Sequence, residues 1–595
     1  MRDSHNCAPS RAGSEPRASA RAEPAPSVRL RIAQRHIARA DCPHTRQAES
    51  AQGDTTKARG PATIALATIF ALLGLVPWPG CRTPLERAAW LNDGSVRVPD
   101  AFAVLFLVDG MSADVTERLL NEGRLPNIER IFVRGGVVVR NAVASMPGAT
   151  YANTASIITG LFPGHHGILG NQWFDPSDGT WGDYRHATTY LDVNDDLDAT
   201  TIFDLLGDEL TVNVQGHTHR GATVNELHLV RSGWDWVLKR YSQVDQRVGR
   251  AALDIAEHAR WAGRWPALTM LYFPGVDEHA HRFGAASPQY QRAIMDVDEA
   301  VGRFTSDLRR LGLLDRCYLV LVSDHGMTTA QSHTDVAAWL RRCRGWRVRD
   351  HLPALARWFD GRMPLPGDDA VYIESGGRCA HLHLRGLSGW RQRVSTEVID
   401  AAVRGSCGRP PMTKLPGVHL VCAWHAEGQV SVYTPAGTAL LSRRETDFGA
   451  EYSAIVTSGD PPAVSSALGL PASLAQGEWL SGREWLARTS GGAHPDLVPQ
   501  IVEMFASRRT GDVVLFADQD AMFHPCWRGG HGSTFRDDMR VPLFFSGPDL
   551  QKGVQLPLAR SVDVAPTLMD LLGRSVDPDR TRFDGESLAP LLRPD

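Results

Sequence analysis

Four short apolar runs in this chain each stop shortly before a residue that can bind a metal. The runs are FAVLFLV, TMLYF, YLVLV and VVLFA, and the residues that follow them are, in the same order, Asp109, Asp277, the pair Asp324-His325, and His531. Apolar runs of this length that are bounded by Gly or Asp are typical of parallel strands buried on both faces. Ligands of open α/β sheets bind at the carboxyl ends of such strands. We therefore expect these carboxylates and imidazoles to meet at one edge of a sheet.

Strands and helices alternate between residue 100 and about residue 330. Strands are expected at 102–108, in GGVVVRNAV, at 269–273 and at 318–322, and helices at 113–122, from 151 to 158 and at 288–311. Such alternation predicts a parallel sheet with right-handed crossovers. The predicted fold class is α/β, with a mostly parallel central sheet flanked by helices and a large inserted cap region.

The cap region is expected at 336–500, where Gly, Pro and Trp are frequent and the periodicity is broken. The sheet is expected to resume with VVLFA at 513–517 and VPLFFSG at 541–547. We therefore predict one catalytic α/β domain in two parts, 100–335 and 501–595, separated by this insertion.

The N-terminal part of the chain has a different composition. Residues 1–61 are rich in Arg, Ala, Ser and Pro and contain few large apolar residues, which predicts a disordered extension. Residues 62–81 are apolar and follow Lys57 and Arg59, as in a signal peptide, with an uncleaved membrane anchor as the alternative. Cys81 offers a site for a lipid. We expect export to the periplasm, the exterior or the membrane surface, and a translation start downstream of Met1.

The net charge and the cysteine spacing exclude some partners and some kinds of metal site. A formal net charge of −4 provides no broad basic surface, so bulk nucleic acid is not expected as a partner. The cysteines show no CxxC spacing, which argues against a cysteine zinc site. Disulfides are compatible with an exported chain, but their pairing and the oligomeric state cannot be read from the sequence.

Two local patterns place candidate ligands close together. Asp324 and His325 are adjacent on a turn, and Asp277 and His281 are four residues apart, which puts both on one face of a helix. Aspartate and histidine are ligands suited to zinc, with manganese or iron as substitutes. Each pattern alone is weak, because a lone Asp or His more often caps a helix or faces solvent.

A hydroxyl-rich loop, SMPGATYANTASIITG, precedes one of the expected helices. A helix N-terminus favours a phosphate-like anion, and a threonine hydroxyl beside a metal there becomes a nucleophile. Thr150 is the candidate nucleophile, and Asn153, one turn on, is the candidate donor to a non-bridging oxygen. The alternative is that Thr150 only caps the helix.

The ordered motifs resemble those of a known superfamily. They are Asp109-Gly110, Thr150–Asn153, Ile158-Thr159-Gly160, Asp277–His281, Ser323–Met327 and Gly530–Gly532. Over residues 100–335 and 510–595 the chain resembles the alkaline phosphatase superfamily and, within it, the type I phosphodiesterase/nucleotide pyrophosphatase family. The resemblance implies an alkaline-phosphatase-like fold and two zinc ions. One zinc would be bound by Asp277, His281 and His531, and the other by Asp109, Asp324 and His325, with Thr150 as the bridging nucleophile.

The register of these motifs selects among the hydroxyls. In the superfamily the nucleophile lies nine residues before the Thr of the Thr-Gly pair, and nine residues before Thr159 is Thr150 rather than Ser145. The arginine of a sulfatase signature is also absent, because Ala149 stands in its place. We therefore reject a formylglycine sulfatase.

The resemblance implies a phosphodiesterase or nucleotide pyrophosphatase that hydrolyses small phosphate esters through a phosphothreonine intermediate at the two-zinc site. The sequence departs from the family at Tyr151-Ala152, where Phe-Pro is usual, and at Ala280, where Gly is usual and His279 precedes it. The natural substrate therefore stays open. The alternatives are a phosphomonoesterase, a phosphonoacetate hydrolase and a pseudoenzyme that only binds its ligand.

Overall fold

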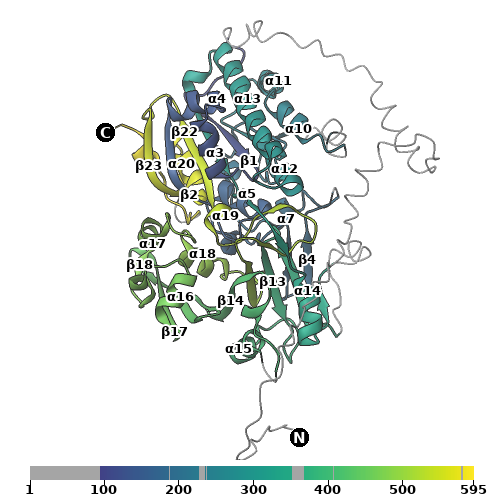
Figure 1. Ribbon diagram of the computed structural model, residues 1–595. Helices are drawn as coiled ribbons and strands as arrows, with labels where there is room; N and C mark the ends of the chain where they lie inside the picture. Colours follow the sequence, from purple (N-terminus) through teal and green to yellow (C-terminus); the bar gives the residue numbers. More distant parts are fainter. Residues whose placement is uncertain are drawn as a thin grey trace, which may run out of the picture. The chain divides into compact units, whose positions relative to one another are not determined.

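In the computed structural model, the apolar runs FAVLFLV, TMLYF and YLVLV form three neighbouring parallel strands (Figure 1). Strand β1 (Phe102–Val108) lies between β8 (Cys317–Ser323) and β7 (Leu268–Phe273), and it is parallel to both. Every residue of the three strands is buried, as expected for apolar runs without alternation. The predicted strands at 102–108, 269–273 and 318–322 are confirmed.

The structure describes residues 94–186, 188–226, 235, 238–351, 367–405, 408–577 and 581–594. The predictions for residues 1–61 and 62–81, including Cys81, fall outside these ranges. Within the described ranges, no helix combines the length and the apolar character needed to cross a membrane.

The first sheet has eight strands in the order β23-β2-β22-β8-β1-β7-β5-β6. The outer strands are β23 (Val554–Arg560), β2 (Val137–Val143), β22 (Arg540–Ser546), β5 (Thr211–Val214) and β6 (Val224–Glu226). Only β22 runs antiparallel to its neighbours, so the prediction of a mostly parallel sheet is confirmed. Figure 1 shows the C-terminal strands β22 and β23, in yellow, on either side of the N-terminal strand β2.

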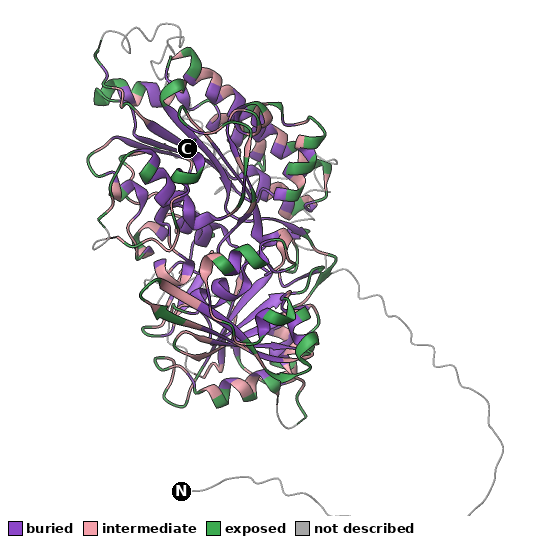
Figure 2. Cartoon of the chain, turned by 90° about the vertical axis from the view of Figure 1, so that its left-hand side faces the viewer, coloured by how far each residue is buried: buried purple, intermediate pink, exposed green. Residues whose placement is uncertain are grey.

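Helices cover both faces of this sheet, because successive side chains of a strand point in opposite directions. The even-numbered residues of β1 pack with α3 (Ala113–Asn121), α10 (Tyr241–Val248), α11 (Ala252–Ala262) and α13 (Pro288–Arg310). The odd-numbered residues pack with α5 (Thr150–Thr159), α8 (Ile202–Leu205), α20 (Val564–Leu571) and α21 (Ala589–Leu592). Figure 2 shows the strands buried between these layers.

A second sheet of nine strands has the order β11-β12-β13-β19-β14-β15-β16-β17-β18. Its strands are β11 (Val348–Arg349), β12 (Ala370–Ser375), β13 (Cys379–Leu384), β19 (Val513–Ala517), β14 (Val418–Ala426), β15 (Gln429–Thr434), β16 (Gly437–Thr446), β17 (Gly449–Gly459) and β18 (Leu480–Ser481). The helices beside it are α14 (Val336–Trp339), α15 (Thr396–Arg404), α16 (Pro461–Ala467), α17 (Gly482–Thr489) and α18 (Leu497–Met504).

The prediction that VVLFA rejoins the first sheet is wrong. This run forms β19, which pairs antiparallel with β13 and β14 in the second sheet. A five-residue apolar run shows that a strand is buried but not which sheet it enters. The first sheet resumes only at β22. The division of the chain at 336–500 stays a prediction, with β19 on the side of the insertion.

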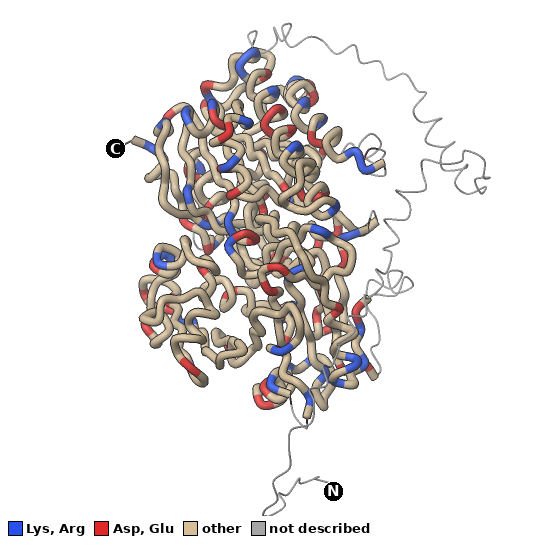
Figure 3. The backbone as a smooth tube through the Cα atoms, viewed as in Figure 1, with Lys and Arg blue, Asp and Glu red and all other residues tan. Residues whose placement is uncertain are grey.

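The structure also has several short elements outside the two sheets. They are α4 (Pro126–Ile128), α6 (Pro163–His166), the hairpin of β3 (Gln172–Asp175) and β4 (Thr180–Asp183), α7 (Val193–Asp196), α12 (Gly275–Phe283), β9 (Thr328–Thr329), β10 (Ser332–His333), β20 (Ala521–Met522), β21 (Gly529–Gly530) and α19 (Arg536–Met539). Figure 3 shows acidic and basic residues interspersed over most of the described chain.

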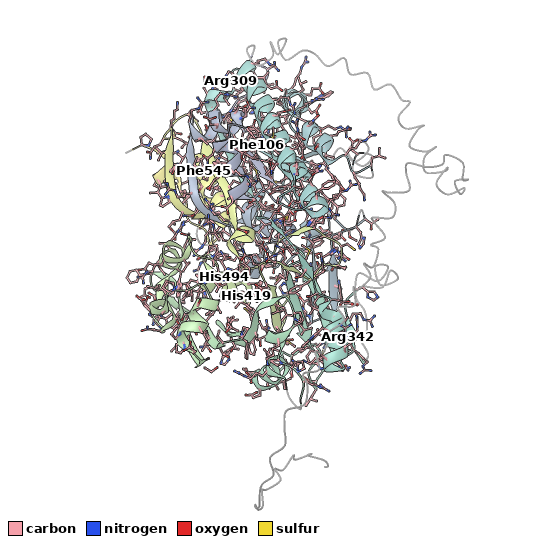
Figure 4. The ribbon with its side chains drawn as sticks, viewed as in Figure 1. Phe106, Arg309, Arg342, His419, His494 and Phe545 are labelled. Carbon is pink, nitrogen blue, oxygen red and sulfur yellow. The ribbon has the colours of Figure 1, made fainter. Side chains whose placement is uncertain are left out.

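Aromatic packing on β1 is central to the first core. Phe106 is fully buried, and its ring lies edge-on to Phe304 with centroids 5.7 Å apart and near Phe273 at 6.4 Å (Figure 4 labels Phe106). Phe106→Ala removes these contacts and leaves a cavity, which costs about 3–5 kcal/mol in the free energy of unfolding. Urea denaturation followed by fluorescence measures this loss.

A matched control is Phe448→Ala, because Phe448 is fully exposed. We expect this variant to stay within about 0.5 kcal/mol of the wild type. An equal loss of stability in both variants would contradict the assignment of Phe106 to the core.

Candidate active site

The six predicted metal ligands form two groups in the structure. Asp109, Asp324 and His325 make one triad, and Asp277, His281 and His531 make the other. The ligand atoms of each triad lie within 4.8 Å of one another. The structure thus brings together residues from four separate parts of the chain in the two sets predicted for them.

Adjacent strand ends build the first triad. Asp109 follows β1, and Asp324 and His325 follow β8. His325 Nδ1 donates to the carbonyl of Gly326 at 2.9 Å, so Nε2 faces the carboxylates, 3.3 Å from Asp109 Oδ1 and 3.4 Å from Asp324 Oδ2. The Tyr272 hydroxyl donates to Asp109 Oδ2 and fixes that carboxylate.

The Asp-Gly turn after β1 has a steric reason. Gly110 has φ of +65°, and a Cβ at this position would lie 2.8 Å from Asp277 Oδ1. Only glycine combines this backbone conformation with so close an approach. The turn therefore places the two triads side by side.

Helix α12 provides two ligands of the second triad. Asp277 and His281 are one turn apart, with His281 Nε2 3.0 Å from Asp277 Oδ2. His531 Nε2 lies 3.7 Å from Asp277 Oδ1, and its Nδ1 donates to the carbonyl of Gly148 at 2.6 Å. The spacing of four residues thus placed both α12 ligands correctly.

We expected His531 to follow a strand of the first sheet, and this expectation is wrong. His531 follows β21, which pairs antiparallel with β9 just after His325. This pairing brings the two histidines together, and their rings stack with centroids 3.5 Å apart and planes 9° apart. The two triads are therefore in direct contact.

The donor atoms fit a divalent cation in each triad. One carboxylate oxygen of each of Asp109, Asp277 and Asp324 is buried without a hydrogen-bond partner. Burial and the neighbouring charge of Asp109 raise the pKa of Asp324 well above its usual range. Buried carboxylates are costly unless they are paired or bind a metal. A cation at each triad would satisfy these oxygens.

Thr150 lies where a nucleophile is expected. It is the first residue of α5, and its Oγ1 is 3.3 Å from His325 Nε2. The N-cap residue is Ala149, which has no side-chain cap bond. Thr150 therefore does not cap the helix, and its hydroxyl faces the first triad.

We expected the Asn153 side chain to donate to a non-bridging phosphate oxygen, but its amide is already hydrogen-bonded within the protein. Its amide nitrogen donates to the carbonyls of Ser145 and Pro147 at 3.0 Å each, and its Oδ1 accepts from the Ser145 amide at 2.7 Å. The fully buried side chain holds the loop before α5 together. Asn171 instead lies at the start of α5, where its Oδ1 accepts from the Tyr151 amide at 3.4 Å. No spacing in the sequence marked Asn171.

Residues 103–388 match the family model described as type I phosphodiesterase / nucleotide pyrophosphatase. This part of the chain is therefore similar to that family. An uncharacterized pyrophosphatase/phosphodiesterase of Schizosaccharomyces pombe is 28% identical over 244 residues, which are 40% of this chain and 46% of the relative. Human ectonucleotide pyrophosphatase/phosphodiesterase family member 7 is 26% identical over 318 residues, 52% of this chain and 63% of the relative.

The chain thus spans about half the length of the curated relatives that it matches. The solved structure of murine ectonucleotide pyrophosphatase/phosphodiesterase 5 covers 82% of this chain and 100% of that chain, at 17% identity and a TM-score of 0.49.

The departures from the family pattern have different surroundings. Ala280 is fully buried in the first core, so its methyl group packs inside the protein. The Tyr151 ring is nearly buried and packs between two neighbours, His217 at 4.0 Å and Tyr184 at 4.9 Å. Burial lowers the pKa of His217 to about 4, so this imidazole is neutral at pH 7. Both side chains therefore lie in packed surroundings.

A buried ion pair holds the loops that bear the ligands. Asp538 accepts from Arg378 Nε at 2.8 Å and from the Ser533 amide at 2.7 Å, and it also accepts from the Thr328 hydroxyl. Both charged side chains are fully buried. Ser533 is two residues after His531, so this carboxylate joins the loops that follow β8 and β21.

Asp538→Ala is expected to lower the free energy of unfolding by about 3–5 kcal/mol, because it leaves the Arg378 charge buried and unpaired. Chemical denaturation measures the loss. The control is Asp400→Ala, which removes the carboxylate of an exposed pair with Arg404 and should cost at most about 1 kcal/mol. A wild-type denaturation midpoint for Asp538→Ala would refute the role of this pair.

Proposed function

We propose that this protein is a metal-dependent phosphodiesterase or nucleotide pyrophosphatase that hydrolyses phosphoric ester bonds of small molecules. One observation carries the proposal: the Thr150 hydroxyl lies at a helix N-terminus, 3.3 Å from His325 Nε2 and beside two buried Asp/His triads. The match to the family model and the names of the relatives support the same reaction class.

The metal sites follow from the two triads. We propose that Asp277, His281 and His531 bind one zinc ion and that Asp109, Asp324 and His325 bind the other, with manganese or iron as substitutes. A divalent cation at each triad would supply Lewis acidity that stabilises negative charge on oxygen. Both triads combine carboxylate and imidazole ligands, which suits zinc.

Thr150 is the proposed nucleophile. Its Oγ1 forms a bond to phosphorus while the bond to the leaving ester oxygen breaks, which gives a phosphothreonine. Water then cleaves the bond between phosphorus and Oγ1 and restores the hydroxyl. The free amides at the start of α5 favour the extra negative charge on phosphorus, because they form the positive end of the helix. Asn171 is the side-chain amide at this end of the helix.

Export is proposed for the whole chain. Cys526 forms a disulfide, which is typical of proteins in oxidising compartments. Cys317, Cys343, Cys379 and Cys422 are free. The relatives include proteins named ectonucleotide pyrophosphatase and venom phosphodiesterase.

Thr150→Ala is expected to lower kcat by about 10³- to 10⁶-fold, since it removes the nucleophile itself. The zinc content should stay at the wild-type level, because the six other ligands remain. Steady-state kinetics together with metal analysis by mass spectrometry test both parts.

Thr150→Ser is the matched control, because it keeps a hydroxyl at this position and should keep part of the activity. Full activity of Thr150→Ala would rule out Thr150 as the nucleophile.

The substrate class is tested by comparing initial rates on bis-p-nitrophenyl phosphate, p-nitrophenyl phosphate and phosphonoacetate. We expect the diester to be hydrolysed fastest. Faster hydrolysis of the monoester would indicate a phosphomonoesterase, and faster cleavage of phosphonoacetate a carbon–phosphorus hydrolase. Zinc-loaded protein that turns over none of the three would favour a binding pseudoenzyme.

A further inference from the structure

His281 is the most exposed of the three histidine ligands. Its side chain is 11% exposed, compared with 1% for His531 and 0% for His325. It also lies in the last turn of α12, where a helix has the fewest backbone hydrogen bonds to hold it. Its orientation therefore depends on what packs against it.

Trp527 packs on the His281 ring. The two ring centroids are 3.6 Å apart, with planes tilted by 31°. His524 stacks on Trp527 with centroids 4.1 Å apart. The indole thus contacts two imidazoles, one of which is a predicted metal ligand.

The backbone beside Trp527 holds His281 at two further points. The Arg528 amide donates to the His281 carbonyl at 2.9 Å, and His281 Nδ1 donates to the Gly529 carbonyl at 2.8 Å. The second bond fixes the tautomer and leaves Nε2 free to face Asp277. Hydrogen bonds of this kind set the orientation and basicity of a metal-binding histidine.

The segment 524–529, here called the clamp, is itself attached to its surroundings at Cys526, Trp527 and Gly529. The Trp527 carbonyl accepts from His333 Nε2 at 2.7 Å, and Gly529 pairs with Thr329 in the β9–β21 ribbon. Cys526 is exposed and disulfide-bonded, directly before Trp527. A covalent link next to the indole restricts the conformations that the clamp can adopt.

We propose that the clamp fixes His281 for metal binding, that Trp527 is a positioning residue, and that the disulfide of Cys526 makes the affinity of this site depend on oxidation. This inference rests on the metal site of the proposed function. Reduction by a water-soluble phosphine breaks the S–S bond. The phosphine gives two electrons and takes an oxygen atom from water, whose two protons go to the two sulfurs. The clamp then loses its covalent link.

The effect should appear in zinc binding to one triad only. Removing a side chain that orients a metal ligand typically lowers metal affinity by about 10- to 100-fold. We expect Trp527→Ala to weaken one of two zinc sites by this factor and to leave the other unchanged. Trp527→Phe should restore most of the affinity, because it keeps an aromatic face on His281.

The experiment titrates metal-free protein with zinc in competition with a chromophoric chelator. It compares the wild type, Trp527→Ala, Trp527→Phe and Cys526→Ser, each before and after phosphine treatment and removal of the phosphine. Trp261→Ala is the control, because Trp261 is 90% exposed on α11. Thermal unfolding of each metal-free variant checks that it is folded.

We expect reduction to weaken one zinc site of the wild type and to have no effect on Cys526→Ser, which should already bind weakly. Zinc affinities of Trp527→Ala and of reduced wild type within about twofold of the untreated wild type would overturn the clamp. A wild type that binds no zinc would instead overturn the proposed metal site and the clamp with it. A zinc-loaded, clamp-dependent protein without esterase activity would overturn only the proposed function.

Discussion

Three aspartates buried against one another are the costliest feature of this fold. In the part of the chain that the structure describes, Asp109, Asp277 and Asp324 form ion pairs with histidines only. Carboxylates at such short separations repel one another and lose their hydration. The protein must therefore hold them in place with a rigid frame, and that frame is the row of parallel strand ends at β8, β1 and β7.

The frame continues outward from the strand ends through hydrogen bonds. Each of the three histidine ligands donates Nδ1 to a backbone carbonyl, namely Gly326, Gly529 or Gly148. Each Nε2 is thereby directed toward carboxylates. The same arrangement ties the nucleophile loop, the β9–β21 ribbon and the turn after β8 into one structure. Metal binding and nucleophile placement thus depend on the same backbone positions.

The parts of this site that sequence reasoning predicted are those governed by local rules. Chain geometry alone predicts three of these features. They are a carboxylate after a buried strand, two side chains four residues apart on one face of α12, and a hydroxyl at a helix N-terminus. The sheet entered by β19 could not be predicted, because five apolar residues fit either sheet equally well. The role of Asn153 depends on how its own loop folds, and that of Trp527 on a contact between distant segments. Asn153 turned inward to satisfy loop carbonyls, and Trp527 reached His281 across a gap of 246 positions in sequence.

The bond from His531 Nδ1 to the Gly148 carbonyl has a consequence for which substitutions this protein can tolerate. Gly148 is two residues before Thr150, the proposed nucleophile, so a shift of this loop would also move His531, a proposed metal ligand. Substitutions within this loop that alter substrate binding would therefore also disturb the proposed catalytic centre. The second sheet supplies none of the six ligands. The turn between β12 and β13 is still tied to the triads, because the Gly376 carbonyl accepts from the His531 amide at 2.8 Å and Arg378 pairs with Asp538. Strands of this sheet away from that turn can therefore vary with less effect on the two triads.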